Sequence, residues 1–230
     1  MLPPTITPGI LPVRTATPLL PTDGTTARMS SIALYLNVSG AACYETAVGS
    51  LVCLGQVHNP LDVPVEQVTV GVQLVNAEGV VLADQQALVF RWIIPPNAAA
   101  PYRVLFERVP PGYAGAYVYV GTGEVAHDVD LRYAVLTAQP VSGTFMIDEY
   151  QVTLSVLNEG TTVAQHLAAT MTLLNENGQV TGFARIQPDQ GVHLAPGEAL
   201  ALSIKVIPQA QGTVAFDAFV EGQVTAVVDP

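Results

Sequence analysis

Lysine is almost absent from this chain of 230 residues, and charge of either sign is scarce. Lys205 is the single lysine and the seven arginines are scattered, while 19 acidic residues bring the formal net charge to −11. Nucleic-acid binding needs clustered Lys and Arg to neutralise phosphates, so we expect no nucleic-acid partner. Anionic membrane surfaces are disfavoured for the same reason. The acidity favours solubility and does not itself indicate a function.

Long apolar runs and an export signal are also missing. No apolar stretch reaches the ~18 residues of a membrane-spanning helix, so we expect no membrane span in this chain. The first residues lack the basic and apolar regions of a signal peptide. Two explanations stay open: the protein is cytoplasmic, or its export signal has been removed.

Catalytic and metal-binding motifs are missing as well. The chain contains no Gly-x-Ser-x-Gly nucleophile motif and no phosphate-binding loop. Its four histidines stand singly, without the spacing of metal ligands. The segment 127–130, His-Asp-Val-Asp, is better explained as a solvated linker than as a metal site. We therefore expect no enzyme activity, no metal and no cofactor.

Cysteine is limited to Cys43 and Cys53. They lie ten residues apart on segments predicted as adjacent strands, where a disulfide could close. The alternative is a pair of buried thiols, because free cysteine commonly behaves as a small buried apolar residue. We favour the disulfide on condition of export, since disulfides persist in oxidising compartments.

What the chain does contain is an internal repeat at an offset of 99 residues. The offset superimposes the following pairs: Asn59 and Asn158, Leu74 and Leu173, Gly79 and Gly178, Tyr117 and Phe216, Gly123 and Gly222. A unit of this length is expected to be a complete domain with its own core. We therefore predict a first β-sandwich at 29–124 and a second at 125–230.

From residue 31 onward, apolar and polar residues alternate between regularly placed turn signals. Val70, Val72 and Leu74 illustrate the alternation, which places one face of a strand on a core. The segment 165–174 is the nearest candidate for a helix, but its counterpart 66–75 alternates as a strand, so we predict a strand. Many short strands of this kind favour an all-β chain of two tandem immunoglobulin-like antiparallel β-sandwiches.

Residues 1–28 differ from the rest of the chain because they are rich in proline and threonine. Proline fixes φ and removes a donor, so this segment favours an extended polyproline conformation over a packed one. We interpret it as a stalk or tether. It could anchor the chain to a surface, or lie along the sheet edge of a neighbouring molecule.

The residues around the shared asparagines and glycines resemble the FxLYD domain family. In the first copy the resemblance rests on segments 55–59, 72–76 and 79–82, and in the second copy on 155–158 and 171–175. It implies small immunoglobulin-like sandwiches of exported or surface-anchored bacterial and archaeal proteins. The family has no general catalytic residues, so the resemblance implies none here.

One aromatic cluster occurs only in the first copy. Alternation predicts a strand with Phe90, Trp92 and Ile94 on one face. Aromatic side chains near a surface can stack on sugars or anchor a protein partner. Arg91 and Tyr113 complete the candidate binding set. The alternative is that Trp92 belongs to the core of the first sandwich.

These features favour a non-catalytic extracytoplasmic structural or interaction module, secreted or anchored at the cell surface, that serves adhesion, scaffolding or surface assembly. We expect a protein partner or self-assembly. The alternative function is a glycan- or peptide-binding domain that uses the aromatic face of the first sandwich. What both copies share is expected to be scaffold, and what only the first copy has is where we expect specificity.

Overall fold

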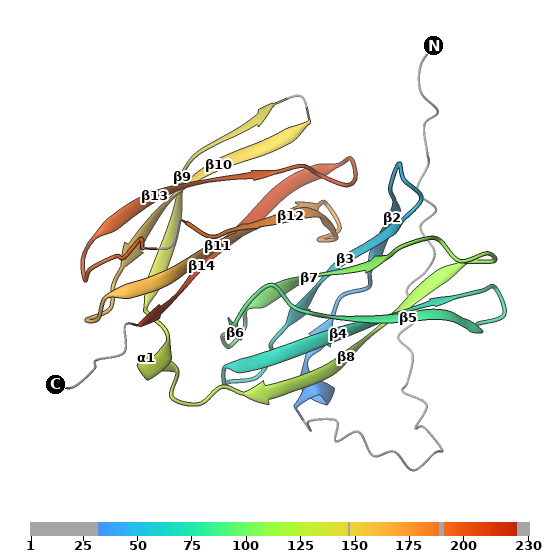
Figure 1. Ribbon diagram of the computed structural model, residues 1–230, viewed down its shortest axis with the longest axis horizontal. Helices are drawn as coiled ribbons and strands as arrows, with labels where there is room; N and C mark the ends of the chain where they lie inside the picture. The colour runs from blue at the N-terminus through green and yellow to red at the C-terminus, as the bar shows by residue number, and fades with distance from the viewer. Residues whose placement is uncertain (1–31, 147, 189–190, 225–230) are drawn as a thin grey trace.

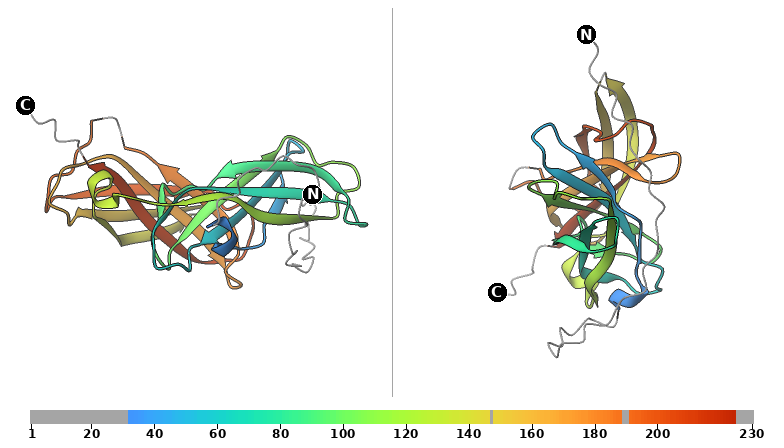
Figure 2. Two further views of the ribbon diagram at one scale, coloured as in Figure 1. Left: turned by 90° about the horizontal axis from the view of Figure 1, so that it is seen from below. Right: turned by 90° about the vertical axis from the view of Figure 1, so that its right-hand side faces the viewer.

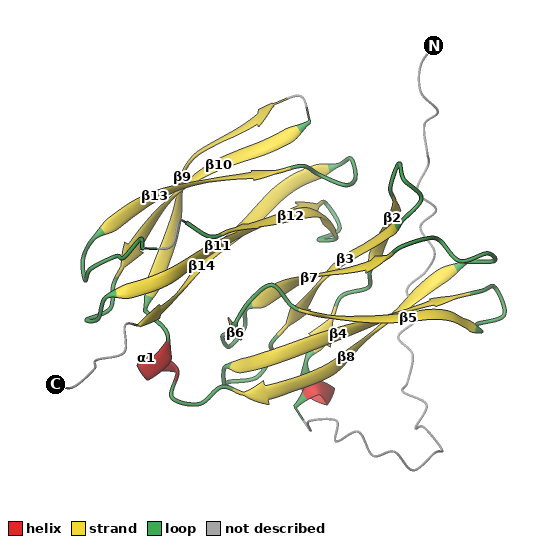
Figure 3. Cartoon of the chain, viewed as in Figure 1, coloured by secondary structure: helices red, strands yellow, loops and turns green. Residues whose placement is uncertain are grey.

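The computed structural model describes residues 32–146, 148–188 and 191–224, and these residues form an all-β fold (Figures 1 and 3). In the first copy a 3-10 helix, η1 (Ala33–Tyr35), precedes eight strands: β1 (Asn37–Val38), β2 (Ala42–Glu45), β3 (Leu51–His58), β4 (Val65–Val75), β5 (Val81–Leu88), β6 (Ile93–Ile94), β7 (Ala99–Phe106) and β8 (Gly115–Val125).

The second copy begins with a short helix and continues in strands. Its elements are α1 (Val129–Arg132), β9 (Leu136–Met146), β10 (Glu149–Asn158), β11 (Ala164–Asn175), β12 (Val180–Ile186), β13 (Ala199–Val206) and β14 (Thr213–Val224). The segment 165–174 is therefore strand, as predicted. The boundaries predicted for the two sandwiches stay a prediction.

Each copy contains two antiparallel sheets. In the first copy β3 lies between β7 and the pair β1 and β2, and β4 lies between β8 and the pair β5 and β6. In the second copy β10 lies between β9 and β13, and β11 lies between β12 and β14. The predicted fold class, an antiparallel immunoglobulin-like β-sandwich, is confirmed.

Strand pairing corrects one equivalence that the sequence offset predicted. Tyr117 on β8 opposes Gln73 on β4. The equivalent of Gln73 on β11 is Thr172, which opposes Asp217 on β14. Tyr117 is therefore equivalent to Asp217, at an offset of 100, and the predicted match with Phe216 is wrong by one residue.

A β-bulge explains this shift. Thr69 opposes Thr122, but the next residue, Val70, opposes Val120, so Gly121 is an extra residue in β8. At the equivalent place in β11 and β14 the register runs on without interruption. A bulge of this kind adds one residue to one strand and leaves the pairing on either side intact. Beyond the bulge the offset returns to 99, as the sequence suggested.

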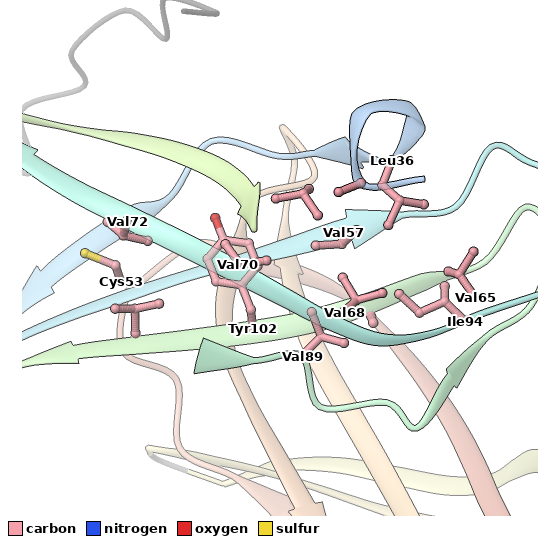
Figure 4. Packing of buried hydrophobic residues seen from close by; sticks show 14 of the residues in the cluster. Leu36, Cys53, Val57, Val65, Val68, Val70, Val72, Val89, Ile94 and Tyr102 are labelled. Carbon is pink, nitrogen blue, oxygen red and sulfur yellow. The ribbon is translucent and has the colours of Figure 1, made fainter. Parts of the chain in front are cut away.

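The alternating apolar residues meet between the two sheets of each copy. Val72 and Leu74 in the first copy, and Met171 and Leu173 in the second, are fully buried, as the alternation predicts. Figure 4 shows the first of these clusters, where residues of β3, β4 and β7 pack with residues from the loops. Each such side chain contributes about 1.5–3 kcal/mol by leaving water.

A buried asparagine holds the loop that follows β3 in the first copy and the loop that follows β10 in the second. Nδ2 of Asn59 donates to the carbonyl oxygens of Val63 and Ile94, both at 2.9 Å, and its Oδ1 accepts the N–H of Leu61 at 3.0 Å. Asn158 makes the equivalent three hydrogen bonds in the second copy. Both residues satisfy backbone groups where a strand leaves the sheet, as expected of the scaffold that the two copies share.

The Asn-x-x-Gly segments that both copies share form tight turns closed by the asparagine side chain. Oδ1 of Asn76 accepts the N–H of Val80 at 2.8 Å, and Gly79 has φ of 82°. Asn175 closes the equivalent turn through Gln179, beside Gly178 with φ of 72°. Glycine is suited to this left-handed conformation because it has no Cβ.

Cys43 on β2 lies directly opposite Cys53 on β3, and their sulfurs form a disulfide. The favoured prediction is confirmed. The predicted Pro/Thr-rich stalk, residues 1–28, lies outside the described residues. Among the helices of the described part of the chain, none has the length and apolar character to cross a membrane.

Candidate functional site

The segment that carries the candidate aromatic residues is a loop. β5 ends at Leu88 and β6 begins at Ile93, so Phe90, Arg91 and Trp92 belong to the connection between them. The predicted strand with Phe90, Trp92 and Ile94 on one face is wrong. Ile94 is fully buried in the first core, whereas Phe90 and Trp92 are half-buried.

The apolar residues of this loop pack on the second copy. The ring of Phe90 meets the ring of Phe183 on β12 edge to face, with 4.7 Å between their centroids. The guanidinium of Arg103 lies 5.6 Å from the Phe90 ring and 5.8 Å from the Phe183 ring. The sequence alternation misled here because the partner of Phe90 is about 90 residues away along the chain. The copies themselves lie one after the other along the molecule (Figure 2).

Trp92 lies at the centre of these contacts. Its backbone N–H donates to Oε1 of Glu221 on β14 at 2.7 Å. The guanidinium of Arg185 on β12 lies 4.8 Å from the Trp92 ring centroid, and the centroid of the Tyr133 ring lies 6.2 Å from it. Trp92 is therefore neither a member of the first core nor a free platform. It joins the two copies.

Arg185 connects the Trp92 loop to Glu221. Its Nη1 donates to the carbonyl oxygen of Phe90 at 2.8 Å and lies 3.0 Å from Oε2 of Glu221. The two side chains are only 12% and 9% exposed. Oε2 is close enough for an ion pair, but among the described residues it has no hydrogen bond of good geometry and Nη2 of Arg185 has no partner. The pair therefore links the two copies, and the dehydration of both charges offsets their attraction.

Burial raises the pKa of the Glu221 carboxyl above its ordinary value of 4.5. The charge of Arg185, the N–H groups of Ile93 and Trp92, and the charge of Arg91 lower this pKa and offset part of the effect. Burial likewise lowers the pKa of Arg91, which lies 4.2 Å above the Phe219 ring and donates to the carbonyl oxygen of Ala99.

Besides the Arg185–Glu221 pair, a second ion pair lies beside the connection between the copies. Only residues 126–128 separate β8 from α1, and the last residue of α1 is Arg132. Arg132 makes two parallel hydrogen bonds of 2.9 Å to the carboxylate of Glu66 on β4. It also donates to the carbonyl oxygen of His127. Bidentate arginine–carboxylate pairs fix orientation as well as distance.

Tyr113, the remaining candidate, is not part of this junction. It lies in the loop between β7 and β8 and packs against the apolar core of the first copy. Burial raises the pKa of its phenol. Tyr102, another tyrosine found only in the first copy, is fully buried and donates to the carbonyl oxygen of Ser39.

We name the contacts of Phe90, Arg91, Trp92 and Arg103 with Phe183, Arg185, Phe219 and Glu221 the junction. Sequence reasoning missed its second half. A signal was available, because the offset of 99 residues places Phe183, Arg185 and Glu221 opposite Asp84, Gln86 and Thr122 of the first copy. Within the described residues, no three His, Cys, Asp or Glu side chains gather as metal ligands.

An open cavity of about 770 Å³ adjoins the junction on the first copy. Its apolar lining includes Val52, Leu88 and Leu105, and Phe90 and Arg103 reach it from the junction. Leu88 and Leu105 are 62% and 56% exposed. The cavity carries no constellation of catalytic groups.

The fold defines the chain as an all-β protein of antiparallel sandwiches. Comparisons with known proteins do not assign it to a narrower family. No family model and no curated protein matches the chain. The FxLYD resemblance therefore stays a prediction.

Among solved structures, the chain is similar to domains of larger enzymes. Red sea bream transglutaminase is 12% identical, with 82% of this chain and 29% of that chain covered and a TM-score of 0.27. The exo-chitosanase of Amycolatopsis orientalis is 15% identical, with 82% and 25% covered and a TM-score of 0.26. A β-glucosidase from Kluyveromyces marxianus is 7% identical, with 76% and 45% covered and a TM-score of 0.24. The chain spans less than half of each, and at these TM-scores the similarity carries no argument.

Proposed function

We propose that this chain is a non-catalytic extracytoplasmic structural module, in which two β-sandwiches are held at a fixed angle for adhesion, scaffolding or surface assembly. The observation that carries the proposal is the junction. Sandwiches in tandem move relative to each other by default unless a specific interface holds them. Here a buried ion pair, the edge-to-face contact of Phe90 with Phe183, the Arg185–Trp92 contact and the Arg132–Glu66 ion pair oppose such motion.

A fixed angle suits a scaffold because ordering flexible parts costs free energy when a partner binds. The disulfide between Cys43 and Cys53 supports the extracytoplasmic compartment, since such bonds persist where the environment is oxidising. The alternative of glycan or peptide binding through the Trp92 loop has less support, because the second copy covers that loop.

Small-angle X-ray scattering tests the fixed angle. The wild-type profile should fit one arrangement of the two copies, whereas Arg185→Met combined with Arg132→Ala should require a wider range of arrangements. Val141→Ala, at an exposed position of β9, is the matched control and should scatter like the wild type. A wild-type profile that needs many arrangements would contradict the proposal.

Thiol labelling tests the extracytoplasmic compartment separately. Protein isolated from its native host should bind a maleimide reagent at Cys43 and Cys53 only after reduction. Free thiols in the untreated protein would argue against export.

A further inference from the structure

The junction uses one particular face of the second copy, the outer face of the β12–β11–β14 sheet. Two rows of side chains cross this face: Arg185, Thr170 and Phe219 in one, and Phe183, Thr172 and Asp217 in the next. Thr170 and Thr172 are almost completely buried. Their burial follows from the contacts that Arg91, Trp92 and Phe90 make with this face.

The same face of the first copy has different side chains. Strand register makes Gln86, Gly71 and Tyr119 equivalent to the first row, and Asp84, Gln73 and Tyr117 equivalent to the second. Asp84 and Gln86 are exposed, and both tyrosines are half-exposed. We name these six residues, with Thr69 and Thr122, the tyrosine face. Within the described residues its hydrogen bonds stay inside the first copy.

Tyr119 is held across the middle of this face. Its hydroxyl donates to Oδ1 of Asp84 at 3.1 Å and accepts from Nε2 of Gln86 at 3.0 Å. Nε2 of Gln73 donates to Asp84 at 2.9 Å. The ring lies so close to Gly71 that a Cβ at that position would overlap it. Glycine inside a strand commonly marks such a close approach. The ring is therefore positioned before any ligand arrives.

The side chains of the tyrosine face are more polar than the equivalent side chains of the junction. Where the second copy has Phe183, Arg185 and Phe219, the first copy has a carboxylate, an amide and a phenol. Glu221 is replaced by Thr122, whose hydroxyl lies 2.8 Å from that of Thr69. Asp84 is the single formal charge among the eight residues. Paired charges and apolar rings that suit a dry protein contact are replaced by polar groups that donate or accept hydrogen bonds, and only Asp84 among them is charged.

We propose that the tyrosine face binds a neutral glycan. Tyrosine rings offer apolar surface with a polar end, which suits the C–H face of a sugar. The amides of Gln73 and Gln86 and the hydroxyls of Thr69 and Thr122 can each donate and accept, as sugar hydroxyls require. A protein occupant is less well matched, because a face that docks protein in this chain carries Phe and paired charges.

The test is a titration of the full chain, labelled with ¹⁵N, with neutral hexasaccharides: cellohexaose, xylohexaose, mannohexaose and N-acetylchitohexaose. At least one should shift the amide signals of residues 69–73, 84–86 and 117–122. Tyr119→Ala should weaken that binding at least about tenfold, the effect of losing a ring contact together with its hydrogen bonds. Tyr119→Phe, which keeps the ring, should lose less affinity than Tyr119→Ala.

The matched control is Tyr35→Ala, because Tyr35 is an exposed tyrosine of the same copy and is not one of the eight residues of this face. It should leave the affinity unchanged. Three outcomes overturn the proposal: no binding to any of the four sugars, signal shifts centred on the Trp92 loop, or shifts at the tyrosine face that depend on protein concentration without sugar. The last would identify a protein contact. None of these outcomes alters the scattering test, so the two proposals fail separately.

Discussion

At the scale of single residues, the two copies are built around the same buried asparagine. Asn59 and Asn158 are both 0% exposed, and each uses its amide to satisfy two carbonyls and one N–H of neighbouring loops. An unpaired buried backbone group costs free energy on the scale of a lost hydrogen bond. The sequence revealed both residues because the repeat marked them twice and because two of the three hydrogen bonds of each reach only two or four residues along the chain.

Asn59→Ala should lower the free energy of unfolding by about 2–4 kcal/mol, because two buried carbonyls and one N–H lose their partner. Asn158→Ala should have a similar effect through the second copy. Urea denaturation followed by circular dichroism measures both. Gln85→Ala, at an exposed position of β5, should stay within about 0.5 kcal/mol of the wild type. A loss below about 1 kcal/mol for Asn59→Ala would contradict the structural role given to this residue.

At the scale of elements, the strands were predictable and the loop after β5 was not. Alternation in β4 and β11 records burial against the opposite sheet of the same copy, which is a regular and repeated environment. The alternation around Phe90 and Trp92 records burial against the second copy instead. A pattern of apolar residues does not say which surface covers them, so Glu221 and Arg185 could not be paired with this loop from sequence alone.

The carboxylate on β14 makes the junction sensitive to pH. Burial raises the pKa of Glu221 in the folded protein above the 4.5 of an unfolded chain. Between these two values the folded state holds more protons at this site than the unfolded state does. The contribution of Glu221 to the free energy of unfolding is therefore greatest below pH 4.5 and declines as the pH rises through the folded pKa.

Glu221→Gln should remove this decline. Its amide oxygen can still accept the N–H of Trp92, but its amide nitrogen cannot accept a hydrogen bond as the second carboxyl oxygen can, so we expect a loss of about 1–3 kcal/mol in the free energy of unfolding at pH 4.5. The loss should be larger at pH 4.5 than at pH 8. Urea denaturation of both proteins across this range measures it, with Val214→Ala as the control on the same strand. A loss that does not change with pH would contradict the burial of this charge.

At the scale of the whole molecule, the two copies carry different side chains on equivalent sheet faces. The outer face of the β12–β11–β14 sheet docks the first copy, and the equivalent face of the first copy carries Tyr119 and neutral polar groups instead. The first copy therefore serves as an internal comparison for the second, with the same backbone and different side chains. Equivalent backbone positions with different side chains show that the docking function depends on the side chains and not on the sandwich itself.

The junction should make the two copies respond to substitution as one body. Trp92 lies in the first copy and Arg185 in the second, and they meet through a cation–ring contact of 4.8 Å. Residues in contact show coupling free energies of about 0.5–3 kcal/mol in a double-mutant cycle, whereas distant ones add independently. We expect Trp92→Ala and Arg185→Met together to cost less than the sum of their separate losses. The pair Trp92→Ala and Val141→Ala should add, because Val141 lies exposed on β9. Strict additivity in both pairs would mean that the contact between the copies contributes nothing to their stability.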